Sequence, residues 1–171
     1  MIQRAADTFS PAWLSCKSKA EACRNVPALL PFNKTVVACA RPTGDDQVPF
    51  VLVVEDEAMI REFITEDLQE AGYQVLMAGN ADAAVDILEG RHDIGLVFTD
   101  VNMPGSMDGL ALAACVRGRW PQVHIVITSG RSCSADKLGG GAVFVPKPYH
   151  GSNIIDAIGT FPDMRARRVA P

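Results

Sequence analysis

The chain has 171 residues, of which 48% are hydrophobic and 21% are charged, and its formal net charge is −4 at pH 7. These proportions are typical of a globular protein of one domain, and they exclude collagen-like, wholly disordered and strongly basic chains. The sequence has no run of about 20 apolar residues that could span a membrane, and its negative charge argues against nucleic acid as the main partner. We therefore expect binding to neither DNA nor membranes.

The charge is unevenly distributed and divides the chain into three parts. Residues 1–47 and 162–171 each carry a net charge of +2, which leaves −8 for residues 48–161. The first part has four prolines, no sustained periodicity and no apolar run suited to a signal peptide, so we predict an irregular or disordered extension. The last ten residues predict a basic tail, and one folded domain lies between. The five cysteines are odd in number and widely spaced, which favours reduced thiols in a cytoplasmic protein.

Apolar runs alternate with amphipathic segments from residue 50 onward. Phe50–Val54 is continuously apolar, which is typical of a strand buried on both faces. The pattern predicts strands at 50–54, 73–78, 95–99, 123–128 and 142–145, and helices at 58–71, 80–89, 109–118 and 152–161. The apolar residues at helical spacing in the first helix are Ile60, Phe63, Ile64, Leu68 and Ala71. Gly72 is placed to end that helix, and Asn80 to begin the next one.

Strict alternation of strands and helices with short connections predicts a parallel sheet covered on both faces. Five such units fit a flavodoxin-like, doubly wound α/β fold with a five-stranded parallel sheet in the order 2-1-3-4-5. The connection between the fourth and fifth strands is irregular, because only Ser132–Leu138 is available for a helix before three consecutive glycines. We therefore expect the fourth helix to be shortened.

Polar residues stand at the carboxyl ends of four predicted strands. The first strand is followed by Glu55-Asp56-Glu57, the third by Asp100 and the fifth by Lys147-Pro148, and the fourth ends in Thr128-Ser129. The carboxyl ends of parallel strands share one edge of the sheet, where ligands bind in open α/β folds. Carboxylates gathered there need a hard cation such as Mg²⁺ to neutralise their repulsion. One carboxylate could then attack a phosphoryl group whose oxygens are held by the lysine and the threonine.

Each of these residues has a plainer interpretation when it is taken alone. The acidic run could cap the first helix, because acids favour helix N-termini, and Asp100 could be an ordinary turn residue. Thr128 could simply end a strand, and Lys147 could be a surface lysine. None of these interpretations explains why residues far apart in the sequence share one edge.

Five short motifs follow one another in a recognisable order. They are Val53-Val54-Glu55-Asp56-Glu57, Phe98-Thr99-Asp100-Val101-Asn102-Met103-Pro104-Gly105, Asp108-Gly109, Ile127-Thr128-Ser129 and Pro146-Lys147-Pro148-Tyr149. Together they strongly resemble the receiver domain of two-component response regulators, over about residues 48–161 and with nearly normal spacing.

The resemblance implies a metal and phosphoacceptor site. By position, Asp100 matches the phosphoryl-accepting aspartate, and Mg²⁺ is the one cofactor expected. Asp56 matches the direct metal ligand, and Glu55 matches an acidic position that acts through water and is more commonly aspartate. Asn102 matches the residue whose backbone carbonyl completes the metal site, together with Asp100.

The resemblance also implies a switch. Thr128 matches the switch hydroxyl, Lys147 the lysine that pairs with the phosphoryl group, and Phe144 the rotating aromatic. The Lys147–Pro148 peptide is expected to be cis. A histidine kinase or histidine phosphotransfer protein would be the partner that phosphorylates Asp100.

The expected protein is a phosphoacceptor with self-phosphorylation and self-dephosphorylation chemistry, and is otherwise not an enzyme. The segments outside residues 48–161 are too short for an output domain, so we expect signalling through partner proteins in the cytoplasm. The interval from Thr128 to Lys147 is shorter than usual, which puts the family's standard dimer in doubt and leaves a weak dimer through the strand four–strand five face open.

Three alternatives are weighed against this hypothesis. An interaction module that works without phosphorylation would not need the acidic site and Lys147. A flavodoxin-type electron carrier should have a loop rich in Ser, Thr and Gly after the first strand, where Glu55-Asp56-Glu57 stands. An aspartate-nucleophile phosphatase should carry a second aspartate two residues after the nucleophile, where Asn102 stands.

Overall fold

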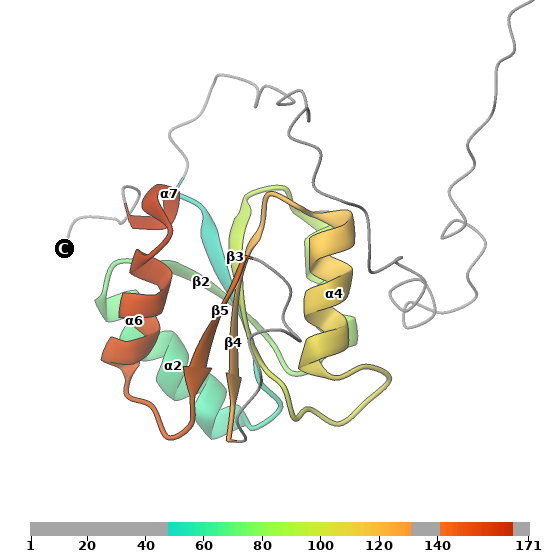
Figure 1. Ribbon diagram of the computed structural model, residues 1–171, viewed down its shortest axis with the longest axis horizontal. Coiled ribbons are helices and arrows are strands. Elements are labelled where there is room, and N and C mark those ends of the chain that lie inside the picture. Colours follow the sequence, from blue (N-terminus) through green and yellow to red (C-terminus); the bar gives the residue numbers. More distant parts are fainter. Residues whose placement is uncertain (1–47, 131–140, 166–171) are drawn as a thin grey trace, which may run out of the picture.

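The computed structural model describes residues 48–130 and 141–165, which form a five-stranded parallel sheet flanked by helices (Figure 1). The strands are β1 (Phe50–Val54), β2 (Gln74–Ala78), β3 (Ile94–Asp100), β4 (His124–Ser129) and β5 (Ala142–Pro146). The helices are α2 (Ala58–Glu70), α3 (Ala81–Gly90), α4 (Gly109–Arg119), α6 (Gly151–Gly159) and α7 (Pro162–Arg165). The order β2-β1-β3-β4-β5, with every pair parallel, confirms the predicted flavodoxin-like, doubly wound α/β fold.

Strand β1, which lies between β2 and β3, is buried on both faces of the sheet. Val51 and Val53 belong to a cluster with buried residues of α2, α6 and α7, whereas Leu52 and Val54 belong to a cluster with those of α3 and α4. Figure 1 shows the same layers, with α2 and α6 on one side of the sheet and α4 on the other. Because neither face of β1 meets water, the strand is apolar at every position.

Capping side chains and a glycine set the ends of three helices. Asn80 caps α3 by accepting a hydrogen bond from the backbone N–H of Ala83 at 2.8 Å. Asp108 caps α4 by accepting from the N–H of Ala111, also at 2.8 Å. Gly72, just after α2, has a φ of +84°, a left-handed conformation that glycine adopts without steric cost. These caps fix where each helix begins or ends relative to the strands.

The apolar face of α2 is narrower than its sequence pattern indicates. Phe63 lies at helical spacing with Ile64 and Leu68, yet 55% of its surface is exposed, and Met59 one turn earlier is 78% exposed. Ile64 and Leu68 are completely buried against the sheet. Phe63 and Met59 therefore form an apolar surface on the outer side of α2.

The fold extends beyond residue 161, the predicted end of the domain, and includes α7. The short helix α7 buries Met164 against the cluster that α2 and α6 share, with 1% of its surface exposed. Next to it, His124 Nε2 lies 2.8 Å from Asp163 Oδ1, and the imidazole stacks on Phe161 at a centroid distance of 4.1 Å. A single apolar residue among charged ones carries no periodicity, so the sequence pattern did not predict this turn.

Cysteine chemistry also departs from expectation. Cys115, fully buried on α4, is disulfide-bonded, so the expectation of reduced thiols is wrong for this residue.

Several predicted segments lie outside the described residues. They are the N-terminal extension at 1–47, the shortened fourth helix at Ser132–Leu138 and the end of the basic tail at 166–171. Of the helices in the described part of the chain, none has the length and apolar character needed to cross a membrane.

Candidate functional site

The register of the sheet brings the predicted site residues to one edge. Asp100, the last residue of β3, pairs with Thr128 of β4, and Thr128 pairs in turn with Val145 of β5. The pairing continues just past the strands, because the Lys147 N–H donates to the carbonyl of Ser129 at 2.9 Å. These backbone bonds hold Asp100, Thr128 and Lys147 in fixed relative positions.

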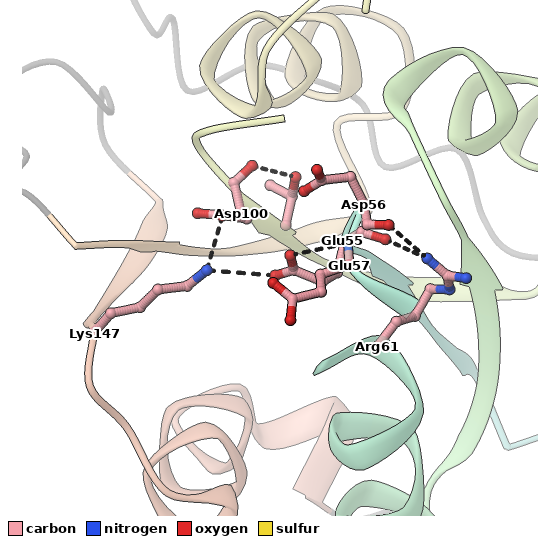
Figure 2. Close-up of polar contacts among 7 residues, drawn as sticks. Glu55, Asp56, Glu57, Arg61, Asp100 and Lys147 are labelled. Carbon is pink, nitrogen blue, oxygen red and sulfur yellow. Dashed lines mark hydrogen bonds and ion pairs between the residues drawn. The ribbon is translucent and has the colours of Figure 1, made fainter. Parts of the chain in front are cut away.

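Three carboxylates converge at this edge (Figure 2). Glu55, Asp56 and Asp100 each offer an oxygen, and the three oxygens lie within 4.8 Å of one another. Glu55 and Asp100 are 2% and 5% exposed, whereas Asp56 faces solvent. The site thus has a buried floor and an open side through which an ion could enter.

Lys147 pairs with both buried carboxylates of the site. Its Nζ donates to Asp100 Oδ2 at 2.8 Å and lies 3.5 Å from Glu55 Oε2 (Figure 2). Burial alone lowers the pKa of Lys147, but the hydrogen bond to Asp100 and the charges of Glu55 and Asp100 outweigh it and raise the pKa. The ammonium therefore stays charged at neutral pH. The Lys147–Pro148 peptide is cis, as the resemblance implies.

Glu55 is not fully neutralised by this lysine. Burial raises the pKa of Glu55, as does the neighbouring charge of Asp100, whereas Lys147 and the backbone N–H of Glu57 lower it by less. A raised pKa means that the buried, ionised carboxylate lacks enough positive charge around it.

The oxygen atoms of the site fit Mg²⁺, and one unpartnered oxygen of Asp100 supports this independently. Asp100 Oδ1 is buried and has no hydrogen-bond partner within the described residues, whereas Oδ2 accepts from Lys147. A buried carboxylate oxygen without a partner is costly unless a cation or donor meets it. Together with the carboxylates of Glu55 and Asp56 beside it, Asp100 offers the oxygen ligands that Mg²⁺ prefers. The residues that would hold the ion are Glu55, Asp56 and Asp100.

Arg61 is a site residue that sequence reasoning missed. From α2 its Nη1 donates to the backbone carbonyl of Glu55 at 2.6 Å and approaches that of Asp56 at 3.4 Å (Figure 2). The guanidinium thereby holds the loop that carries the acidic pair, through the main chain. The only indication in the sequence was a cation in the first turn and a half of the helix that follows the acidic run.

The remaining predicted residues lie around this centre. Thr128 is fully buried, and its Oγ1 has no hydrogen-bond partner within the described part of the chain. Phe144 on β5 is half-buried and packs against the cluster beneath α3 and α4. Asn102 is exposed two residues after Asp100. The roles assigned to these three residues stay predictions.

A parallel, doubly wound sheet with an acidic cluster and a lysine at its carboxyl edge defines the flavodoxin-like class of α/β proteins that binds its ligands there. The family profile of the response regulator receiver domain matches residues 51–159, and the chain belongs to that family. Receiver domains of two-component systems bind Mg²⁺ at an acidic site of this kind and are phosphorylated by histidine kinases.

Known proteins similar to this chain include two regulators from Pseudomonas aeruginosa. The transcriptional regulatory protein AruR is 41% identical over 97 residues, which are 54% of this chain and 39% of AruR. The response regulator protein FleR is 32% identical over 113 residues, which are 63% of this chain and 23% of FleR. The chain therefore spans well under half the length of these relatives.

A solved structure supports the same assignment. The response regulator TrrA from Thermotoga maritima, in complex with Mg²⁺ and BeF, is 28% identical and superposes with a TM-score of 0.60. The alignment covers 66% of this chain and 97% of TrrA.

Proposed function

We propose that this chain accepts a phosphoryl group on Asp100 in a Mg²⁺-dependent reaction, from a histidine kinase or a histidine phosphotransfer protein. The observation that carries the proposal is the environment of Asp100. One of its oxygens accepts from Lys147 at 2.8 Å, the other is buried without a partner, and two further carboxylates stand beside it. TrrA, a similar receiver, holds Mg²⁺ and BeF in its complex, which supports the same chemistry here.

The reaction is a displacement at phosphorus. A carboxylate oxygen of Asp100 forms a bond to phosphorus while the bond from phosphorus to the donor's imidazole nitrogen breaks, and that nitrogen keeps the electron pair. The product is an acyl phosphate on Asp100 and a free histidine on the donor. Catalysis then depends on positioning and on neutralising the phosphoryl charge.

The residues of this chain supply both effects. Backbone pairing of β3 with β4 fixes Asp100, and Lys147 is placed to hold a phosphoryl oxygen by its charge. Arg61 keeps the acidic loop in place through its carbonyls. Mg²⁺, bound by Glu55, Asp56 and Asp100, would supply positive charge to the phosphoryl oxygens.

Thr128 and Phe144 carry the proposed response. Thr128 is next to Asp100 across the β3–β4 ladder, so its hydroxyl can turn toward a phosphoryl group there. Phe144 lies on β5 beside Ile127 and would move inward as Thr128 turns, biasing two packings of the β4–β5 face. Output then runs through partner proteins, and the cytoplasm, where kinases phosphorylate receivers, is the proposed location.

Return to the resting state requires water at the acyl phosphate. Gly130 lies two residues past Thr128, and a carbon added there would meet no atom of the described residues within 4 Å, so we place the attacking water on that side. In this role the chain reacts with its donor and with water and is itself the product, so we propose that it is not an enzyme with a separate substrate.

The proposal is tested by labelling with a small acyl-phosphate donor in the presence of Mg²⁺. We expect labelling of the wild type, none of Asp100→Asn, and full labelling of the matched control Asp156→Asn, which makes the same change on the exposed side of α6. Chelation of the metal should abolish labelling of the wild type. If Asp100→Asn is labelled as strongly as the wild type, the assignment of the phosphoryl group to Asp100 fails. If the wild type is not labelled at all, the result favours an interaction module that works without phosphorylation.

A further inference from the structure

Tyr149 has no role in the chemistry described above, yet it lies close enough to the site to respond to its charges. It follows the cis Lys147–Pro148 peptide, and its ring packs edge-on against Phe98 at a centroid distance of 6.1 Å and an interplanar angle of 86°. Its hydroxyl is buried and has no hydrogen-bond partner within the described residues. A phenylalanine would pack in the same way without burying a polar atom.

The charged groups of the acidic site act on this hydroxyl. The pKa of Tyr149 is raised to about 12, mainly by burial and also by the charges of Glu55 and Asp100, whereas the charge of Lys147 opposes the rise. The Thr128 hydroxyl is close enough to lower the same pKa as a hydrogen-bonding neighbour, although the two oxygens do not meet the geometry of a formed hydrogen bond. The phenol therefore keeps its proton and lies beside Thr128.

Two buried hydroxyls side by side, both without partners among the described residues, are an unusual arrangement. Each buried polar group without a partner costs more than a formed hydrogen bond gains, so such pairs persist where one state of the protein satisfies them. A threonine hydroxyl can donate one hydrogen bond while it accepts another, whereas a protonated phenol can donate. When Thr128 donates to a phosphoryl oxygen on Asp100, its own oxygen is left to accept.

We propose that Tyr149 is a positioning residue for Thr128, donating its O–H to Thr128 Oγ1 in the phosphorylated state and so aiming the threonine proton at the phosphoryl group. The inference rests on the proposed function of Asp100. A chain of two hydrogen bonds strengthens each member, because the accepting hydroxyl becomes a better donor. Tyr149 touches neither the phosphoryl group nor the metal, and its effect passes through Thr128 alone.

The test is a double-mutant cycle on binding of beryllofluoride, a phosphoryl mimic, with Mg²⁺ present. Tyr149→Phe should weaken binding about 3- to 10-fold, the range expected for one hydrogen bond, and leave the affinity for Mg²⁺ alone unchanged. In a Thr128→Ala background the same substitution should have no further effect. Tyr73→Phe, which removes the other tyrosine hydroxyl of the chain, serves as the matched control and should leave beryllofluoride binding unchanged.

A second measurement separates positioning from packing. In protein labelled with 3-fluorotyrosine, the two tyrosines give two ¹⁹F resonances, and Tyr149→Phe identifies one of them. We expect the Tyr149 resonance to shift on addition of Mg²⁺ and beryllofluoride in the wild type, and not in Thr128→Ala.

The outcomes divide cleanly. If the wild type binds beryllofluoride and Tyr149→Phe binds it equally well, or is weakened by the same factor in the Thr128→Ala background, the inference is overturned while the proposed function stands. If the wild type binds no beryllofluoride and is not labelled at Asp100, the proposed function itself fails, and the inference with it.

Discussion

Replacement of Gly109 by alanine is expected to displace the backbone of Asp100. Gly109 is the first residue of α4, and its N–H donates to the carbonyl of Val101 at 3.1 Å, so the helix starts directly against the end of β3. A carbon added at Gly109 would overlap the carbonyl oxygen of Asp100 and lie 2.7 Å from its carbonyl carbon. It would also lie 3.0 Å from the Cα of Val101. All three obstructing atoms belong to the backbone.

The size of the effect follows from these contacts. Carbon atoms in contact lie at about 3.5–4.0 Å, so the Asp100 peptide and α4 must separate by about 0.8 Å or more. Overpacking costs about 1–3 kcal/mol, and a clash with backbone belongs at the upper end, near about 3 kcal/mol. Replacing glycine by alanine in a helix interior stabilises the helix by about 1 kcal/mol. Gly109 is the first residue of α4, so only a small part of this gain offsets the cost of the clash. We expect the melting temperature to fall by about 10 °C.

Thermal unfolding followed by circular dichroism measures this loss, and labelling with a small acyl phosphate measures its consequence at Asp100. Gly90→Ala is the matched control, because a carbon added there meets nothing within 4 Å, and its melting temperature should stay equal or rise slightly. If Gly109→Ala melts within about 2 °C of the wild type, the tight contact between α4 and the Asp100 backbone is not as described.

Three further predictions concern the charges of the site. Burial raises the pKa of Glu55 above the ordinary glutamate value of 4.5. Above pH 4.5 the folded, metal-free protein therefore still binds a proton at Glu55 that the unfolded chain has released. The free energy of unfolding consequently falls as the pH rises above 4.5. Urea unfolding at about pH 5 and about pH 8 measures this fall, and Glu55→Gln should remove it. An equal change in unfolding free energy between the two pH values in both proteins would contradict the prediction. Lys147→Met removes the positive charge beside Glu55 and Asp100. It should destabilise the metal-free protein by about 2–4 kcal/mol near neutral pH, and it should tighten Mg²⁺ binding as measured by calorimetry. An unchanged affinity for Mg²⁺ would refute this prediction. Arg61→Met should weaken Mg²⁺ binding about 3- to 10-fold without removing a ligand, whereas the control Arg91→Met, which breaks a pair with Asp93, should not.

The sequence was sufficient to predict the fold and the positions of the central residues. Phe50–Val54 is apolar throughout because β1 is covered on both faces, and that run identifies a parallel sheet. In a parallel sheet the carboxyl ends of the strands meet, so residues as distant as Asp56, Asp100 and Lys147 could be assigned to one edge. The order 2-1-3-4-5 was predicted because five units of strand and helix fit this doubly wound arrangement.

Features that depend on contacts between elements could not be predicted in this way. Helical spacing groups Phe63 with Ile64, but only the packing of α2 on the sheet decides that Phe63 faces solvent. Arg61 acts through two main-chain carbonyls, which no residue type in the sequence marks. Tyr149 belongs to the motif that follows β5, but the burial of its hydroxyl beside Thr128 depends on how that loop folds.

The central claim is that Asp100 receives the phosphoryl group, and locating that group on the wild-type chain tests it most directly. After incubation with Mg²⁺ and a small acyl-phosphate donor, the acyl phosphate can be reduced with borohydride and the modified residue located by peptide mass spectrometry. The account predicts one modified residue per chain, at Asp100, and a phosphoryl linkage that is lost on mild alkaline treatment, as an acyl phosphate is. Modification at any other residue, or a linkage stable to alkali, would contradict it.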